Sequence, residues 1–257
     1  MAPGGETMNR RDALKAFAGL ALCQLCRPAL AAEGAHWSYE GATGPAKWGD
    51  LDAASKVCSI GQQQSPIDII APLKAQLPPL KLNWAKSADT IVNNGHTIQL
   101  NFAEGSSLTL GDRKFKLLQV HFHRPSEHLV AGRSFPMEAH FVHRADSGAL
   151  AVVGVLMSTG KPNAAFARVV ATMPAREGPP VKADPAFNPN DMLPKKLTYY
   201  RYPGSLTTPP CAETVEWLVL TTPITVAETD VAAFAKLYPM NARPVQRDNR
   251  RYVLVSG

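Results

Sequence analysis

The chain has 257 residues, 45% of them hydrophobic, and its 27 lysine and arginine residues against 21 acidic residues give a formal net charge of +6. The positive residues are scattered along the sequence and form no stripe with interleaved aromatic residues, so we expect no nucleic-acid partner. No second long apolar run follows the N-terminus, so we expect no membrane span in the rest of the chain.

The N-terminal segment has the layout of an export signal. Arg10 and Arg11 precede an apolar stretch from Ala16 to Cys26, and Ala29-Leu30-Ala31 supplies a small-residue cleavage site. The stretch is too short to span a bilayer core of about 30 Å. We therefore expect residues 1–31 to be a signal peptide, and the paired arginines indicate the twin-arginine route. A buried amphipathic helix is the alternative, but the stretch lacks helical periodicity.

Removal of this leader leaves residues 32–257, a length that suits one domain with a large core. We expect this single domain to be periplasmic or secreted, without a membrane anchor. Two of the four cysteines, Cys23 and Cys26, lie in the leader, so only Cys58 and Cys211 remain. Two cysteines in an exported protein favour one disulfide, and two unpaired buried thiols are the alternative.

Short alternating or apolar runs recur between turn clusters in the remaining chain, which is typical of a mostly β domain. The predicted strands are 97–102, 107–110, 115–123, 137–143, 150–158, 197–202 and 214–220. Proline-rich stretches at 178–180 and 185–194 predict long ordered loops around the sheet. Two short helices are expected, one over Asn163 to Met173 and one that the capping box Thr225-Val226-Ala227-Glu228 opens and that ends before Pro239.

Most of the histidines lie in two short segments, 119–123 and 137–143. Residues two apart share a face of a strand, so His121 and His123 project together. The loop between the segments contains glycine and proline and can return the chain antiparallel, which lays His140 beside the pair. A His-x-His pair alone is more often a solvated surface strand, but the third histidine predicts a metal site.

Three neutral histidines around Zn²⁺ leave one coordination position open, which is typical of catalytic rather than structural zinc. Water in that position ionises near neutral pH. Gln119 and Glu138 each precede a predicted ligand by two residues and can lie beside it on the same face. Each can accept the other N–H of the imidazole and so fix its tautomer and orientation. A solvated carboxylate is the alternative for Glu138.

Motifs along nearly the whole predicted mature chain combine in a specific way. They are Gln119-Val120-His121-Phe122-His123, Ser126-Glu127-His128, Met137-Glu138-Ala139-His140, the segment from Tyr202 to Pro210, and the flanking segments 36–39, 64–69, 93–96 and 241–244. Together they closely resemble the α-carbonic anhydrase family, although no single motif is specific. The resemblance implies a mixed, mainly β fold. A twisted, largely antiparallel central sheet would carry peripheral short helices, with the metal at the bottom of a conical cleft.

The implied activity is the zinc-dependent, reversible hydration of carbon dioxide to bicarbonate and a proton by zinc-bound hydroxide. By this resemblance Thr207 accepts a hydrogen bond from the hydroxide and donates one to Glu127, which orients the attack. Thr208 would position bicarbonate. An apolar wall would hold carbon dioxide, and it would consist of Val142, Val152, Leu206, Val215 and Trp217.

The resemblance also implies a path for the released proton. His96 would be the proton shuttle, because an ordinary histidine pKa near about 6.5 suits relay to buffer. Tyr39, Asn94 and Gln99 would organise the water between this histidine and the zinc. Asn241 would not bind the metal itself but would contact the ligand histidines. A turn histidine without a catalytic role is the alternative for His96.

Two histidines are predicted to have no catalytic role, and two other residues depart from the family pattern. His128 and His143 are predicted to be structural, His143 because its odd offset from His140 turns it to the opposite face. Arg124 and Ala242 stand where animal members of the family commonly carry tryptophan. With the leader, these departures resemble the bacterial branch of the family.

Two other functions remain open from the sequence. A zinc esterase acting mainly on an unknown ester would use the same metal site, and relative rates on carbon dioxide and esters distinguish the two. A binding module with this fold would have lost catalysis, but such proteins usually lack a ligand histidine. We expect a monomer or homodimer that acts on small-molecule substrates, carbon dioxide and bicarbonate, with some side esterase activity.

Overall fold

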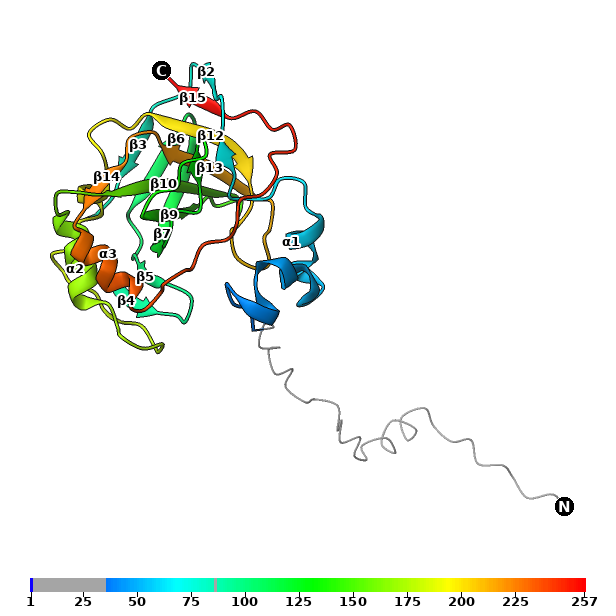
Figure 1. Cartoon of the computed structure of the whole chain (residues 1–257). Helices are drawn as coiled ribbons and strands as arrows, with labels where there is room; N and C mark the ends of the chain where they lie inside the picture. Colours follow the sequence, from blue (N-terminus) through cyan, green and yellow to red (C-terminus); the bar gives the residue numbers. More distant parts are fainter. Residues whose placement is uncertain (2–35, 86) are drawn as a thin grey trace. The chain divides into compact units, whose positions relative to one another are not determined.

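The computed structural model describes Met1 and residues 36–85 and 87–257 (Figure 1). The predicted signal peptide, residues 1–31, lies outside these residues almost entirely and stays a prediction. In the described part of the chain, no helix has both the length and the apolar character needed to cross a membrane.

The described residues form one large mixed sheet and one small one. The large sheet has 13 strands, and its main path runs in the order β11-β4-β5-β7-β9-β10-β13-β12-β15-β2. Its strands are β2 (Leu73–Ala75), β3 (Leu80–Asn83), β4 (Thr90–Asn93), β5 (Ile98–Asn101), β6 (Ser107–Leu110), β7 (Arg113–His123), β9 (Met137–Arg144), β10 (Leu150–Thr159), β11 (Val181–Lys182), β12 (Tyr199–Gly204), β13 (Val215–Leu220), β14 (Ile224–Val226) and β15 (Leu254–Ser256). The small sheet pairs β1 (Asp68–Ile69) with β8 (Leu129–Val130).

Most neighbouring strands of the large sheet are antiparallel, and β10 with β13, β10 with β14, and β15 with β2 are parallel. The predicted fold class, a mainly β domain with a twisted, largely antiparallel central sheet, is confirmed. Each predicted strand is present, and the run at 107–110 matches β6 at both ends. The run at 197–202 is displaced, because β12 begins at Tyr199 and continues to Gly204.

The helices are few and short. They are α1 (Val57–Ile60), α2 (Ala164–Thr172) and α3 (Glu228–Ala235), with the 3-10 helices η1 (Gly41–Thr43), η2 (Pro45–Asp50), η3 (Ala54–Lys56) and η4 (Pro189–Met192). Helix α2 agrees with the prediction, and the side chain of Asn163 caps it by accepting the N–H of Phe166 at 3.0 Å. This contact satisfies one of the free N–H groups of the first turn.

The predicted capping box of the last helix is wrong, although the helix itself is present and ends before Pro239. Helix α3 begins at Glu228, and its N-cap is Ala227, which makes no side-chain capping bond. Thr225 lies in β14 and pairs with Ser158 of β10. The backbone of Thr225 is paired with β10, so Thr225 cannot cap a helix that starts directly after it.

Strand alternation divides the side chains of the central strands between two faces. Phe122 of β7 points to the face that α2 and α3 cover, where its ring lies 5.3 Å from Phe166 and 6.3 Å from Phe234 (Figure 1). The residues on either side of Phe122 are His121 and His123, which therefore face the other way. The fold thus places the histidines on the face opposite the helices.

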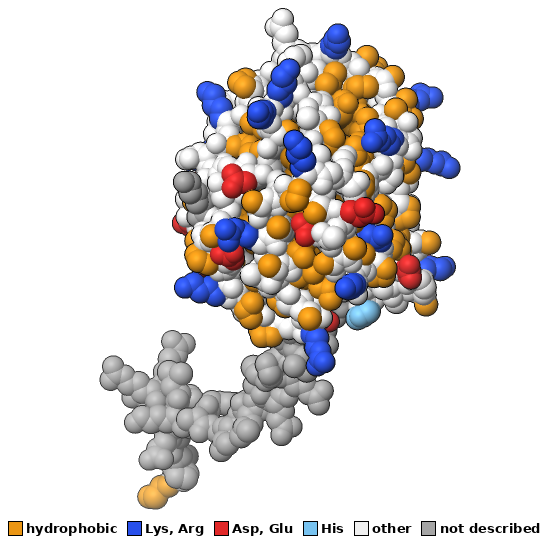
Figure 2. All heavy atoms as spheres, turned by 60° about the vertical axis from the view of Figure 1, so that its left-hand side comes forward, with side chains coloured by type: hydrophobic (Ala, Val, Ile, Leu, Met, Phe, Trp, Pro, Cys, Tyr) orange, Lys and Arg blue, Asp and Glu red, His pale blue; other side chains and the backbone are white. Residues whose placement is uncertain are grey.

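The charged side chains of the surface in Figure 2 are dispersed. Lysine and arginine side chains are spread over this face among apolar and acidic ones, without a continuous basic stripe.

Candidate metal centre

The antiparallel pairing of β7 and β9 brings the three predicted ligand histidines together. His121 lies directly opposite His140, and His123 is two residues further along β7 on the same face. The ring centroids are 4.9 Å apart for His121 and His123, 5.3 Å for His121 and His140, and 4.5 Å for His123 and His140. One ring nitrogen of each lies within 4.8 Å of the other two, so the set has the spacing of a metal site.

Two of these imidazoles have one nitrogen committed to an acceptor and the other free. His121 donates from Nδ1 to Oε1 of Gln119 at 2.8 Å, and His123 donates from Nδ1 to the carbonyl oxygen of Asn241 at 2.7 Å. A carbonyl can only accept, so the lone pair of His123 is on Nε2. That Nε2 is buried and has no hydrogen-bond partner among the residues that the structure describes. A buried lone pair of this kind fits a metal ion.

The third imidazole is oriented by Glu138. Nε2 of His140 lies 3.0 Å from Oε1 of Glu138, which leaves Nδ1 for the metal. Burial lowers the pKa of all three histidines, that of His121 well below its ordinary value and that of His123 to about 4. They are therefore neutral at pH 7, as metal ligation requires.

Glu138 is fully buried and accepts more than one hydrogen bond. Its Oε1 lies 2.7 Å from Nδ1 of His128, and its Oε2 accepts the backbone N–H of His128 at 2.9 Å. Burial alone would raise the pKa of this carboxyl, but His128 and His140 outweigh that effect and hold it well below its usual range. Glu138 is therefore a carboxylate, as an acceptor for an imidazole N–H must be.

Sequence reasoning missed the role of Gly154, which makes room for this carboxylate. Gly154 of β10 lies opposite His140, and a Cβ atom at this position would come within 3.0 Å of Oε1 of Glu138. The available signal was a lone glycine inside an otherwise apolar strand, which often marks a close approach.

Glu127 and Thr207 lie beside the histidines. Oε1 of Glu127 accepts the backbone N–H of Arg243 at 2.8 Å, while Oε2 lies 3.5 Å from Nε2 of His123 and 3.8 Å from Nδ1 of His140. Burial raises the pKa of Glu127 to about 7, although His140, the Thr207 hydroxyl and the Arg243 N–H each lower it. The structure therefore places the two predicted catalytic residues next to each other at the metal centre.

The five predicted wall residues belong to one apolar cluster on the histidine face. Val142, Val152, Val215 and Trp217 are buried in it, and Leu206 packs against it. The ring of Trp217 lies 4.8 Å from that of His140. Thr208 is partly buried and adjoins Thr207 in the loop that follows β12. The cluster thus supplies apolar surface next to the ligands.

The predicted shuttle, His96, is half-buried against an aromatic side chain. Its ring stacks on Trp37 with centroids 3.7 Å apart and planes 9° apart, and the ring of His36 lies 6.5 Å away. Burial lowers the pKa of His96, His36 lowers it further, and Glu177 opposes both. The ring of Tyr39 packs edge-on against Trp37 at 5.3 Å.

The other predicted members of the proton path have mixed surroundings. Gln99 of β5 pairs with His121 of β7, so its side chain lies on the histidine face. Oδ1 of Asn94 accepts the backbone N–H groups of His96 and Thr97 at 3.0 and 2.9 Å. Asn94 therefore shapes the turn that carries His96.

Support from distant segments was largely missed by sequence reasoning. Nε2 of His128 lies 2.6 Å from the hydroxyl of Tyr202, which donates to Oγ of Ser65 at 3.1 Å. His143 turns to the other face, where it accepts the indole N–H of Trp84 at 3.1 Å. Both histidines are thus held by buried hydrogen bonds, and the face of His143 is the one that its odd offset from His140 predicted.

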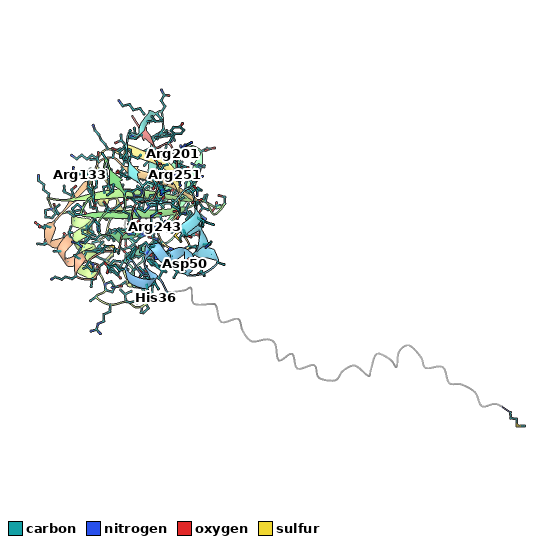
Figure 3. The ribbon with its side chains drawn as sticks, turned by 45° about the vertical axis from the view of Figure 1, so that its right-hand side comes forward. His36, Asp50, Arg133, Arg201, Arg243 and Arg251 are labelled. Atoms are coloured by element: carbon teal, nitrogen blue, oxygen red, sulfur yellow. A yellow bond between two sulfur atoms is a disulfide. The ribbon has the colours of Figure 1, made fainter. Side chains whose placement is uncertain are left out.

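Arg243, labelled in Figure 3, links the metal centre to the N-terminal part of the domain. It is 2% exposed, and its guanidinium donates to the carbonyl oxygens of Ser65 and Cys58 at 2.8 and 3.0 Å. Its backbone N–H meanwhile donates to Glu127. The motif 241–244 is visible in the sequence, but nothing in it indicates these long-range partners.

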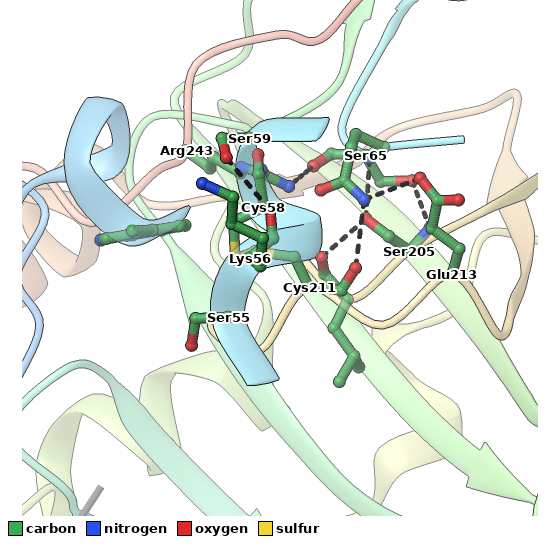
Figure 4. The surroundings of a disulfide bond; sticks show 12 residues. Ser55, Lys56, Cys58, Ser59, Ser65, Ser205, Cys211, Glu213 and Arg243 are labelled. Carbon is green, nitrogen blue, oxygen red and sulfur yellow. Dashed lines mark hydrogen bonds between the residues drawn. A yellow bond between two sulfur atoms is a disulfide. The ribbon is translucent and has the colours of Figure 1, made fainter. Parts of the chain in front are cut away.

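The structure contains the disulfide expected from the cysteine count, between Cys58 of α1 and Cys211 (Figure 4). The carbonyl oxygen of Cys211 accepts the side-chain amide of Gln64 at 3.1 Å, and its N–H donates to the carbonyl of Thr208 at 2.9 Å. The disulfide therefore ties α1 to the loop that carries Thr207 and Thr208.

The fold and this cluster define a β-sheet protein with three converging histidines whose spacing suits a metal ion. The sequence model of the family described as eukaryotic-type carbonic anhydrase matches residues 43–257. A carbonic anhydrase of Neisseria gonorrhoeae is 43% identical over 221 residues, which cover 85% of this chain and 87% of that relative. The chain therefore belongs to the α-carbonic anhydrase family, as its motifs predicted.

Solved structures agree with this assignment. The α-carbonic anhydrase of Thermovibrio ammonificans, in complex with the inhibitor sulfanilamide, is 42% identical with a TM-score of 0.84, covering 86% of this chain and 99% of that one. Dioscorin complexed with ascorbate is 30% identical with a TM-score of 0.80, covering 86% and 97%.

Proposed function

We propose that this chain catalyses the reversible hydration of carbon dioxide to bicarbonate and a proton, with Zn²⁺ held by His121, His123 and His140. The observation that carries the proposal is the set of three neutral imidazoles with converging nitrogens, one of them a buried lone pair without a partner, beside the Glu127 carboxyl. Membership of the carbonic anhydrase family supports the same reaction.

Zinc held by His121, His123 and His140 would act as a Lewis acid and would make a hydroxide nucleophile available at neutral pH. Thr207, next to the Glu127 carboxyl, would donate a hydrogen bond to that carboxyl, so that its hydroxyl oxygen is left to accept one from the nucleophile and orient it. The wall formed by Val142, Val152, Leu206, Val215 and Trp217 holds carbon dioxide, and Thr208 positions bicarbonate. The same site is expected to hydrolyse activated esters as a side reaction.

His96 carries the proton away from the centre, through water ordered by Tyr39, Asn94 and Gln99. His96 lies in the turn between β4 and β5, beside Trp37, and is half-exposed, so it can exchange protons with buffer. We further propose that residues 1–31 direct export and that residues 32–257 act as one domain in the periplasm or outside the cell, as a monomer or homodimer. The disulfide agrees with an oxidising compartment.

Stopped-flow hydration of carbon dioxide by the purified residues 32–257 tests the proposed function. The rate is measured on the zinc-loaded protein, after zinc removal by a chelator, and after zinc is restored. We expect fast hydration that disappears with the metal and returns with it. A folded, zinc-loaded sample that does not hydrate carbon dioxide would contradict the proposal. Faster turnover of esters than of carbon dioxide would show that the main activity is that of an esterase.

Glu138→Gln is expected to weaken zinc binding by about 10- to 100-fold, the usual effect of losing a partner that orients a ligand. The amide keeps the shape of the side chain but removes the charge that holds the His140 N–H. Competition with a chromophoric chelator measures the affinity. Glu216→Gln is the matched control, because Glu216 pairs with Arg113 and Arg201 away from the histidines. Equal affinities of the two variants would contradict this role.

His96→Ala is expected to lower kcat in dilute buffer by about 100-fold, the low end for a positioned acid–base group, with kcat/KM unchanged. Concentrated imidazole should restore kcat. In the wild type, kcat should fall as the pH falls through the His96 pKa, which burial places below its ordinary value of 6.5. Below that pKa the ring already carries a proton and cannot accept another. An unchanged kcat in dilute buffer would exclude His96 as the shuttle.

A further inference from the structure

A pocket of about 630 Å³ reaches Glu127 by a route that includes none of the three histidines or the five wall residues among its lining. Three segments form it: residues 39–46 of the N-terminal 3-10 helices, the loop after β7, and residues 240–245 near the C-terminus. The pocket is therefore separate from the apolar wall beside the metal centre.

The pocket runs from the surface into the interior. Val245, 43% exposed, and the exposed Ala46 lie at its mouth. Ala242, Arg243 and Glu127 are 9%, 2% and 1% exposed and form its floor. An occupant that enters from the open side would thus contact buried residues at the inner end of the pocket.

The walls are mainly apolar, with Pro45, Leu129, Met240 and Ala242 contributing. A volume of about 630 Å³ is within the usual range for pockets that hold small molecules. Burial of apolar surface is therefore the main free energy that an occupant can gain here.

The charges of the floor argue against an ionic occupant. The Arg243 guanidinium has no carboxylate within 4.0 Å among the described ion pairs, and it donates only to backbone carbonyls. The Glu127 carboxyl lies on the same floor. Both groups are already engaged by residues other than an occupant. The guanidinium is bound by Ser65 and Cys58, which do not line the pocket, and the Glu127 oxygens lie against the Arg243 N–H and the histidines, so an ion in the pocket gains no free partner of opposite charge from them. A buried ion without a close partner of its own is costly, so an uncharged molecule fits best.

We propose that this pocket is a second binding site, for an uncharged, mainly apolar small molecule. The occupant contacts both Glu127 and Arg243, the two residues that the hydrogen bond joins. Binding at this site requires neither zinc nor carbon dioxide hydration. The proposal is therefore tested independently of the proposed function.

Three probes with one carbon skeleton and different charges test the occupant: 3-phenylpropan-1-ol, 3-phenylpropanoate and 3-phenylpropylammonium. Methyl NMR spectra of residues 32–257 locate their binding. We expect the alcohol to shift the methyl signals of Met240, Ala242 and Val245 saturably and to leave those of Val152 and Val215 in place. The two ions are expected to bind at least tenfold more weakly.

Two variants test the location. Ala242→Trp fills the floor and is expected to weaken binding of the alcohol at least tenfold. Ala46→Trp blocks the mouth at an exposed position, which makes it the safer substitution for folding, and should have the same effect. Ala149→Trp, in an exposed turn outside the pocket, is the matched control and should bind as the wild type does.

Three results would overturn the proposal. They are the absence of saturable shifts at the pocket methyls with the alcohol, binding of either ion as tight as that of the alcohol, and wild-type affinity in a folded Ala46→Trp or Ala242→Trp protein.

Discussion

His121→Ala is expected to abolish tight zinc binding and to reduce carbon dioxide hydration to the background rate. The variant removes one of three ligands, so the loss of zinc affinity should exceed the about 10- to 100-fold that an outer partner contributes. His121 is the most exposed of the three ligands, and His123 and His140 are each 1% exposed. Its truncation leaves the smallest buried defect, so we expect the protein to fold.

Zinc content after dialysis and the stopped-flow hydration rate measure this effect together. His36→Ala is the control, because His36 is an exposed histidine near His96 and lies outside the ligand set. It should retain one zinc per chain. A His121→Ala protein that also retained zinc and hydrated carbon dioxide at the wild-type rate would contradict the assignment of the ligands.

The clustering of the three histidines could be predicted from the sequence because its geometry is local. His121 and His123 share a face by strand periodicity, and a single antiparallel return puts His140 beside them. The same is true of Gln119, which lies two residues from its partner. The same alternation turns Phe122, which lies between His121 and His123, to the opposite face. Each of these inferences needs only the period of a strand and one turn.

The contacts that sequence reasoning missed join segments far apart in the chain. Arg243 meets Ser65 and Cys58, which are 178 and 185 residues away, and no local pattern indicates such partners. Gly154 is required by the position of the Glu138 carboxylate on a neighbouring strand. Both the contacts of Arg243 and the space beside Gly154 depend on how the sheet is assembled, which local patterns do not show.

The misplaced start of the last helix has a similar cause. The four residues 225–228 have the pattern of a capping box, and a local rule therefore favours a helix from Thr225. Pairing of β14 with β10 engages the backbone of Thr225 instead, and α3 begins at Glu228. A tertiary pairing has overridden a local preference of about 1 kcal/mol.

Removal of the disulfide is expected to have the largest effect on stability. It links residues 153 apart, and the chain-entropy model gives about 5 kcal/mol for a loop of this length. The Cys58→Ser/Cys211→Ser variant should therefore unfold about 10 to 20 °C below the wild type, given the enthalpy of a domain of this size. Cys211 is fully buried and Cys58 is 7% exposed, so the new hydroxyls add a desolvation cost.

Thermal unfolding of the wild type with and without a reductant separates the two contributions, because reduction breaks the bond without introducing hydroxyls. If the bond acts on the unfolded chain, the reduced wild type should lose most of the stability that the double variant loses. At low temperature both proteins should still bind zinc, since the ligands lie on β7 and β9. Reduced protein that unfolds within about 2 °C of the oxidised form would show that the loop carrying Thr207 is held by its packing and hydrogen bonds alone.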